Sequence, residues 1–250
     1  MLQLILWRKQ KLSSIIAICV VVFAVLICLR LSVWQYQRGE QKQQQLSQLA
    51  VSSQQGVMDW QALQSLPDGV NKTGLQVKVS GVVNKQHYWL LDNQIYQGQV
   101  GYDLLAAVSI KGETAPLIVN FGWLKAPANR NQLPSVAWPS SALITATVQI
   151  KQGQLQGFTL ADDIGAESGW PKRIQGVDLA IFSRQLEQPL HAFIGYRKEA
   201  DGLATPHYKS VVMGPDKHYA YAVQWLLIGL ACAVIAYFAM RRRHHENKST

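Results

Sequence analysis

The sequence predicts a membrane protein in which two transmembrane helices, one N-terminal and one C-terminal, flank a mainly antiparallel β (α+β) extracytoplasmic domain. Two observations predict the helices: residues 12–29 contain no charged residue in eighteen positions, and residues 219–240 contain none in twenty-two. A helix that rises about 1.5 Å per residue needs roughly 20 apolar residues to cross the hydrocarbon core, so both segments are long enough. A third observation, the alternation of apolar and polar residues between them, predicts the β domain.

These patterns divide the chain into a cytoplasmic N-terminus (1–11), a transmembrane helix (12–33), a periplasmic β-rich domain (34–218), a second transmembrane helix (219–240) and a cytoplasmic tail (241–250). Basic residues beside membrane spans normally stay in the cytoplasm. Three basic residues and no acid precede the first span, and four basic residues against Glu246 alone follow the second. The first apolar run is longer than the core of a signal peptide and no A-x-A-like site follows it, which predicts an uncleaved anchor.

The composition of the central domain argues against several classes of function. Most of the formal net charge of +9 lies beside the spans, because residues 34–217 carry 16 basic and 14 acidic residues, a net charge of +2. A nucleic-acid partner is therefore not expected. The three cysteines, Cys19, Cys28 and Cys232, all lie in the predicted spans. Without cysteines the central domain has no disulfide and no thiolate metal site, which argues against copper delivery and thiol oxidoreduction.

The helix of the first span is expected to continue outward past Trp34 through a Gln-rich segment with few helix breakers. Trp34, Arg38 and Lys42 recur every four residues, so on a helix they would form one stripe within an arc of about 80°. The functional interpretation has this stripe packing on the helix of the second span to line a groove for a cofactor.

Strand periodicity begins after a polar loop or short helix at residues 56–69. Leu75, Val77 and Val79 alternate with polar residues, which is typical of a strand. Further strands are expected at residues 87–92, 100–110, 116–124, 143–151 and 191–196, separated by segments rich in turn formers. Residues 178–188 predict one short helix that Pro189 stops. The strand order is not readable, and a small barrel and a sandwich both satisfy the pattern.

Four short blocks follow one another along the chain. The stretch LSVWQYQRGEQK contains Trp34, Gln35, Arg38 and Lys42. The stretch LLDNQIYQGQVGYDLL contains Asp92, Asn93, Gly98, Gly101 and Tyr102. The stretch IVNFGWLKAPANRNQLP contains Asn120, Gly122, Trp123, Arg130, Leu133 and Pro134. The stretch GPDKHYAYAVQW contains Pro215, His218, Tyr221, Ala222 and Trp225.

Together these blocks resemble the surfeit-locus family of cytochrome c oxidase assembly proteins, and with the two-span layout the resemblance covers nearly the whole chain. Ser32 stands where glycine is usual in that family, and Gln94 and Phe121 stand where arginine is usual. The resemblance implies an assembly factor for cytochrome c oxidase, a haem–copper terminal oxidase of the respiratory chain. It implies that such a factor assists the handling of haem A or its insertion into the catalytic subunit.

The resemblance also implies haem A as a transiently bound cofactor, and the catalytic subunit and the haem A synthesis machinery as partners. It implies a chaperone, not an enzyme. The lack of an Arg- and Ser-rich transit peptide favours the inner (plasma) membrane of a bacterium. The alternative is a cofactor-free membrane scaffold that stabilises the nascent oxidase subunit.

His218 is the candidate axial ligand of haem iron, because it stands just before the second apolar run and a neutral imidazole is a normal iron ligand. Trp225 belongs to an aromatic belt at the same membrane interface, and Trp34, Arg38 and Lys42 are further candidates for binding the cofactor. The alternative interpretation makes His218 a polar residue that marks where the helix leaves lipid. Trp34 with Arg38 would then be an interfacial anchor.

The remaining residues predict no active site. His87, His191 and His207 are expected to be surface or hydrogen-bonded core residues, since their spacing is not that of a metal site. Asp162 and Asp163 are adjacent, so on a strand they would point to opposite faces and make a poor acid–base pair. A periplasmic enzyme is disfavoured because no nucleophile-elbow, Walker or H-E-x-x-H pattern occurs. A two-span sensor is disfavoured because its tail after Met240 has only ten residues.

Overall fold

The structure is a computed structural model, and it describes residues 2–54, 56–67, 69–129, 132–153, 155, 169–209 and 213–246. The chain divides into two compact units: Met1–Ser47 with Val211–Thr250 forms one, and Gln48–Ser210 forms the other. The first unit is a pair of helices, and the second is built around a β-barrel.

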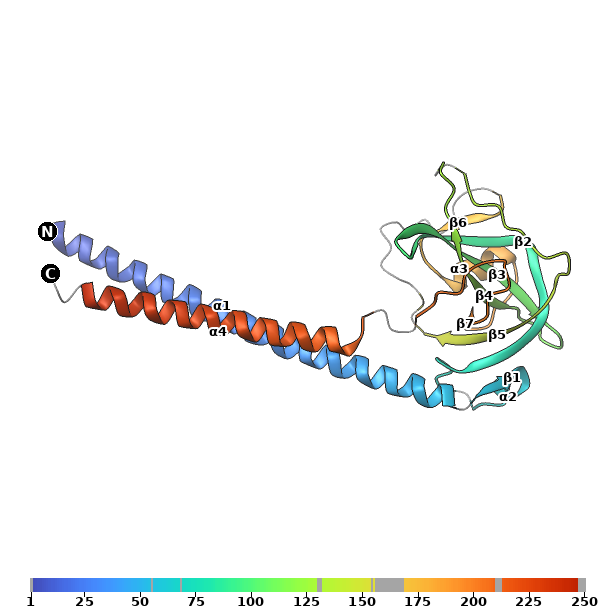
Figure 1. The fold of residues 1–250 in the computed structure, drawn as a ribbon, viewed down its shortest axis with the longest axis horizontal. Helices are drawn as coiled ribbons and strands as arrows, with labels where there is room; N and C mark the ends of the chain where they lie inside the picture. The colour runs from blue at the N-terminus through green and yellow to red at the C-terminus, as the bar shows by residue number, and fades with distance from the viewer. Residues whose placement is uncertain are drawn as a thin grey trace. The chain divides into compact units, whose positions relative to one another are not determined.

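The helix pair consists of α4 (Pro215–Glu246) and the part of α1 (Leu2–Gln54) that belongs to the first unit. The two helices run in opposite directions, with the start of α1 and the end of α4 at the same end of the pair (Figure 1). They contact each other in the middle of α1 and the first half of α4. Each has a stretch long and apolar enough to cross a membrane: Ile15–Ser52 contains an 18-residue window with a mean hydropathy of 2.9, and Pro215–Arg242 contains one with a mean hydropathy of 2.1. The two predicted apolar helices are confirmed, whereas the span limits at 12–33 and 219–240 stay predictions.

The seam between α1 and α4 follows a heptad spacing. Its buried and half-buried positions include Cys28, Ser32, Gln35 and Gly39 on α1 and His218, Ala222, Trp225 and Gly229 on α4. Steps of three and four residues keep one face of each helix toward the other, as in left-handed helix pairs. Small residues allow the backbones to approach closely: a Cβ on Gly229 would lie 3.1 Å from the Cβ of Cys28.

The described part of the second unit contains seven strands and two short helices. In chain order these are β1 (Val57–Asp59), α2 (Trp60–Gln64), β2 (Gln76–Tyr96), β3 (Gln99–Ile110), β4 (Leu117–Lys125), β5 (Leu143–Gln152), β6 (Lys172–Ile174), α3 (Leu179–Leu186) and β7 (Phe193–Arg197).

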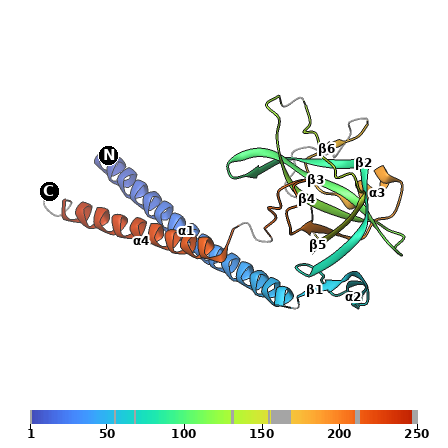
Figure 2. The same ribbon diagram turned by 45° about the vertical axis from the view of Figure 1, so that its right-hand side comes forward.

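Five of these strands close into a barrel. Their order is β2–β3–β4–β7–β5, and β5 pairs back onto β2, so the ring of strands closes on itself (Figure 2). Within the ring every pairing is antiparallel except that of β4 with β7. The short strands β1 and β6 add parallel pairings to β2. The predicted mainly antiparallel β domain is confirmed, and of the two architectures left open by the sequence the barrel is the one that forms.

One long strand, β2, runs where the sequence predicted two strands, at 75–80 and 87–92. The prediction of separate strands is wrong because the polar residues between them form a bulge instead of a turn: the register with β3 shifts between Val83 and Tyr88. Oδ1 of Asn84 accepts hydrogen bonds from the backbone N–H groups of Gln86 and His87, at 3.1 and 2.9 Å. The side chain thus satisfies donors that the bulge removes from the ladder.

The other predicted elements are confirmed within two residues: β3, β4, β5, β7 and α3 match the segments expected at 100–110, 116–124, 143–151, 191–196 and 178–188. Oδ1 of Asp178 caps α3 by accepting from the N–H groups of Ala180 (2.8 Å) and Ile181 (3.1 Å). Glu187, in the left-handed conformation, ends the helix. The strands β1 and β6 were missed, because three residues are too few to show a period.

Alternate residues of β3 and β4 fill two separate cores. Leu104 and Val119 belong to the barrel interior, whereas Leu105 and Ile118 belong to a second cluster with Phe182 of α3. A second bulge, at Phe121 beside Gly122 in β4, interrupts the register between β3 and β4. Glycine inside a strand often marks such a bulge.

Leu104→Ala should lower the free energy of unfolding by about 2–5 kcal/mol, because Leu104 is fully buried and its truncation leaves a cavity. Leu143→Ala, the same substitution at a position that is 65% exposed, should change it by less than about 0.5 kcal/mol. Guanidinium titration of the full-length chain in detergent, followed by tryptophan fluorescence, measures both effects. Equal effects of the two substitutions would contradict the assignment of Leu104 to the barrel interior.

Candidate functional site

The candidate site lies at the start of α4, where His218 meets α1. Pro215 occupies the first turn, which suits proline because its missing N–H would have no partner within the helix. Asp216 places a negative charge at the positive end of the same helix. His218 follows with only 8% of its surface exposed, and its Nδ1 lies 2.9 Å from Oε1 of Gln35 on α1.

Polar contacts on either side of this pair join the same two helices. One turn before Gln35 on α1, Oγ of Ser32 donates a hydrogen bond to the carbonyl oxygen of Ala222, at 2.8 Å. One turn after Gln35, Gly39 lies against the Tyr219 ring so closely that an added Cβ would be 2.5 Å from a ring carbon. The Tyr219 hydroxyl donates to Oε1 of Glu40, at 2.7 Å. These contacts hold the register of the helix pair at the level of His218.

Two of the three residues of the predicted stripe on α1, Trp34 and Arg38, do not face this seam. Trp34 is 48% exposed, and Arg38 is exposed with its Nη1 donating to Oε1 of Gln41 at 3.0 Å. Lys42 is half-buried and donates to Gln45 on its own helix, at 3.0 Å. The expectation that Trp34 and Arg38 pack on the second helix is therefore wrong, because the packed face of α1 steps by three and four residues through Ser32, Gln35 and Gly39.

Trp225 lies two turns after His218 on the same half-buried face of α4. The sequence identified His218 and Trp225 as candidate residues, and the structure places both on the seam. It gave no role to Gln35, which it quoted only as part of a family block. A signal for Gln35 was present in the heptad spacing that relates it to Ser32 and Gly39. The choice of partner across the seam was not readable.

In the barrel unit, a buried carboxylate organises a second polar cluster. Oδ1 of Asp103 lies 2.6 Å from Nε2 of His207, and Oδ2 accepts a hydrogen bond from Nδ2 of Asn120 at 2.7 Å. Oδ1 of Asn120 in turn accepts from the backbone N–H of Gly122, at 2.8 Å. Burial raises the pKa of the neighbouring Tyr196, and Tyr208 and Asp103 add to the increase. The cluster ties the segment around His207 to β3 and β4, as expected for a satisfied core histidine.

His191 lies among aromatic side chains, with its ring centroid 5.0 Å from that of Trp60 and stacked on Phe193. Its Nε2 is buried without a hydrogen-bond partner, and Oε2 of Glu113 is 3.8 Å away. Burial lowers the pKa of His191; the Glu113 carboxylate and a backbone hydrogen bond oppose this, and Lys72 adds to the decrease. The ring of His87 packs on Trp170 at 4.9 Å.

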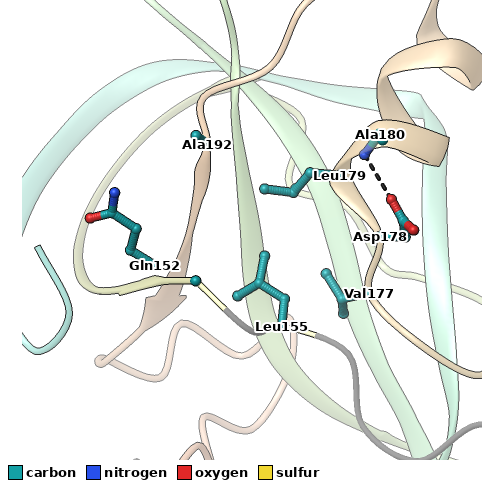
Figure 3. A pocket seen from close by; sticks show the side chains of 8 residues that line it. Gln152, Leu155, Val177, Asp178, Leu179, Ala180 and Ala192 are labelled. Atoms are coloured by element: carbon teal, nitrogen blue, oxygen red, sulfur yellow. Dashed lines mark hydrogen bonds between the residues drawn. The ribbon is translucent and has the colours of Figure 1, made fainter. Parts of the chain in front are cut away.

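Within the described residues, no three His, Cys, Asp or Glu side chains come together in a way that could hold a metal ion. Asp162, Asp163 and Arg130 lie outside the described residues. A pocket of about 470 Å³ is lined mainly by apolar side chains, including Leu155, Val177 and Leu179 (Figure 3). The carboxylate at its rim is Asp178, which already caps α3. The pocket therefore presents no chemistry of its own.

Two apolar helices that meet at a buried histidine, with a β-barrel between them in the sequence, define a two-span α+β protein of the membrane type. The chain matches the model of the SURF1 family over residues 22–230, and it therefore belongs to that family, whose members are assembly factors of cytochrome c oxidase. No curated protein matches the chain in a direct sequence comparison.

The free energy of unfolding should fall as the pH drops below about 6.5, the ordinary pKa of histidine. Below that pH His191 binds a proton in the unfolded chain, whereas in the folded chain its lowered pKa keeps it neutral. His191→Phe keeps an aromatic ring between Trp60 and Phe193 and should reduce this pH dependence. His87→Phe serves as the matched control. Guanidinium titrations of the full chain between pH 5 and pH 8, in steps of about half a unit, measure the effect. A slope unchanged by His191→Phe would contradict the explanation.

Proposed function

We propose that this protein receives and hands over haem A during the assembly of cytochrome c oxidase, with His218 as the axial ligand of the haem iron. One observation carries the proposal: a histidine at the start of an apolar helix is held through Nδ1 by Gln35, while its Nε2 has no hydrogen-bond partner among the described residues. A neutral imidazole nitrogen with a free lone pair is a normal ligand of haem iron. Haem A is a cargo in this proposal, supplied by the haem A synthesis machinery and passed to the catalytic subunit.

The surroundings of His218 suit a large apolar ring with charged propionates at one edge. Trp34 and Tyr221 expose aromatic surface, and Arg38 and Lys217 expose cationic groups. An exposed ion pair contributes only about 0–1 kcal/mol. Burial of the macrocycle, at about 25 cal/mol per Å² of apolar surface, would therefore supply most of the affinity. Lys42 and Trp225 are half-buried and are further candidates for contact with the cargo.

A second candidate function is a cofactor-free scaffold that steadies the nascent oxidase subunit. The burial of His218 favours it, because an imidazole that is 8% exposed and hydrogen-bonded to Gln35 can also be a structural tie within the helix pair. The first candidate function predicts that the purified protein carries haem, and the second predicts that it carries none. Both make the protein an assembly factor without a catalytic step.

The proposed location is the inner membrane of a bacterium, with both termini in the cytoplasm and the barrel in the periplasm. The basic residues that flank both apolar stretches support this orientation. A reporter active only in the periplasm should be active when inserted in the β3–β4 turn at Gly112, and it should be inactive when fused after Thr250. The reverse pattern would contradict this orientation, because it would put the barrel in the cytoplasm.

Protein purified in mild detergent from cells that make haem A should carry a Soret absorption band, and His218→Ala should remove most of it by removing the ligand. His207→Ala, which changes a histidine of the barrel, is the control and should keep the pigment. Haem content is measured from the pyridine haemochrome spectrum per mole of chain. A colourless wild-type protein in the presence of abundant haem A contradicts cargo binding. The scaffold then remains if the wild type and His218→Ala both restore oxidase activity to a deletion strain.

A further inference from the structure

We propose that Gln35 is the positioning residue for His218: it holds the imidazole proton on Nδ1 and so makes Nε2 the atom that binds the iron. The inference rests on the proposed function, since it concerns the atom through which His218 acts. Gln35 itself need not touch the cargo. The observation behind it is the 2.9 Å contact between Nδ1 of His218 and Oε1 of Gln35.

The chemistry of the two groups gives this contact a direction. A carbonyl oxygen only accepts hydrogen bonds, so the imidazole nitrogen that faces Oε1 must carry the proton. A neutral imidazole has one protonated nitrogen, so Nε2 then keeps its lone pair. If the amide were turned so that its NH₂ group faced Nδ1, the proton would lie on Nε2 and would block a metal there. The orientation of one carboxamide therefore decides whether the ring is ready to bind iron.

The helix pair fixes the distance between the two side chains. Ser32 and Gly39 lie one turn on either side of Gln35, and they contact Ala222 and Tyr219 of α4. With the register held on both sides, the imidazole and the carboxamide stay opposite each other. A polar group that loses its partner at an apolar seam carries an unfavourable desolvation cost, so each side chain restrains the other.

A hydrogen bond at the non-ligating nitrogen of a histidine also changes the ligand itself. The acceptor orients the ring and raises its basicity, and loss of such a partner typically weakens metal binding by about 10–100-fold. A more basic imidazole stabilises ferric over ferrous iron, so the acceptor also influences the midpoint potential. Gln35 is thus expected to influence affinity and potential without being a ligand.

Three variants of the full-length chain test the proposal. Gln35→Leu removes the acceptor, Gln35→Glu keeps an acceptor oxygen at the same reach, and Gln37→Leu makes the same change as the first at an exposed position on α1. The first measurement is the ¹⁵N spectrum of histidine-labelled protein without haem, in which the His218 signals are identified by their loss in His218→Ala. The second is titration with haem A and determination of the Kd and the midpoint potential.

In the wild type, Nδ1 should give a protonated, pyrrole-like signal and Nε2 an unprotonated, pyridine-like one. Gln35→Leu should convert these signals into a mixture of tautomers, weaken haem A binding by about 10–100-fold and raise the midpoint potential. Gln35→Glu should retain the wild-type tautomer and lower the potential, and Gln37→Leu should change nothing. Retained helical circular dichroism and melting temperature in Gln35→Leu show that the helix pair is intact.

A wild-type spectrum with the proton on Nε2 overturns the proposal, as does a Gln35→Leu protein whose tautomer, Kd and potential all equal those of the wild type. If Gln35→Leu does not fold, Gln35→Glu decides, because a structural role alone does not change the midpoint potential. If the wild type binds no haem A, the proposed function fails. The spectrum without haem still shows, in that case, whether Gln35 holds the His218 proton.

Discussion

The pairing of α1 with α4 is the constraint on which the candidate site depends, because His218 has its partner only when the two helices are in register. Lipid is as apolar as the helix surfaces, so apolar burial alone does not choose between registers. Close backbone approach and polar contacts select the register. Gly39 against Tyr219, Ser32 with Ala222, and Gln35 with His218 act at successive turns of one seam.

The barrel unit is stabilised by different interactions. The length of β2, at 21 residues, lets one strand pair with both β3 and β5 and so close the ring. Inside and outside faces of β3 are both buried, and Asp103, His207 and Asn120 form hydrogen bonds with one another and with the backbone N–H of Gly122. Such a domain has its own core and does not need the helix pair to explain its packing.

Features that depend on local pattern were readable from the sequence. The two apolar helices, four of the five barrel strands and the short helix α3 follow from charge-free runs, alternation and capping residues. The bulge of β2 was misread as a break between two strands, because a bulge and a turn both favour polar residues and only the hydrogen bonds of Asn84 distinguish them. Composition alone predicted two helices long and apolar enough to span a membrane, but not which of their faces would meet.

For the site too, local features were readable from the sequence, whereas contacts between distant residues were not. His218 was identified by its position at the edge of an apolar run, which is a local property. Its partner Gln35 lies 183 residues earlier, and the stripe of Trp34 and Arg38 attracted attention because it recurs every four residues. Trp34 and Arg38 each precede a seam position by one residue along α1, so the sequence placed these two side chains about 100° away from the observed seam.

The distance between Gln35 and His218 along the chain has a consequence for biosynthesis. At about 5–20 residues per second, a ribosome needs roughly 10–40 s to make the residues that separate the two halves of the site. During that time α1 stands in the bilayer without α4, and the intervening domain can fold. The imidazole site is thus the last part of the molecule to form, and a prematurely terminated chain never acquires it.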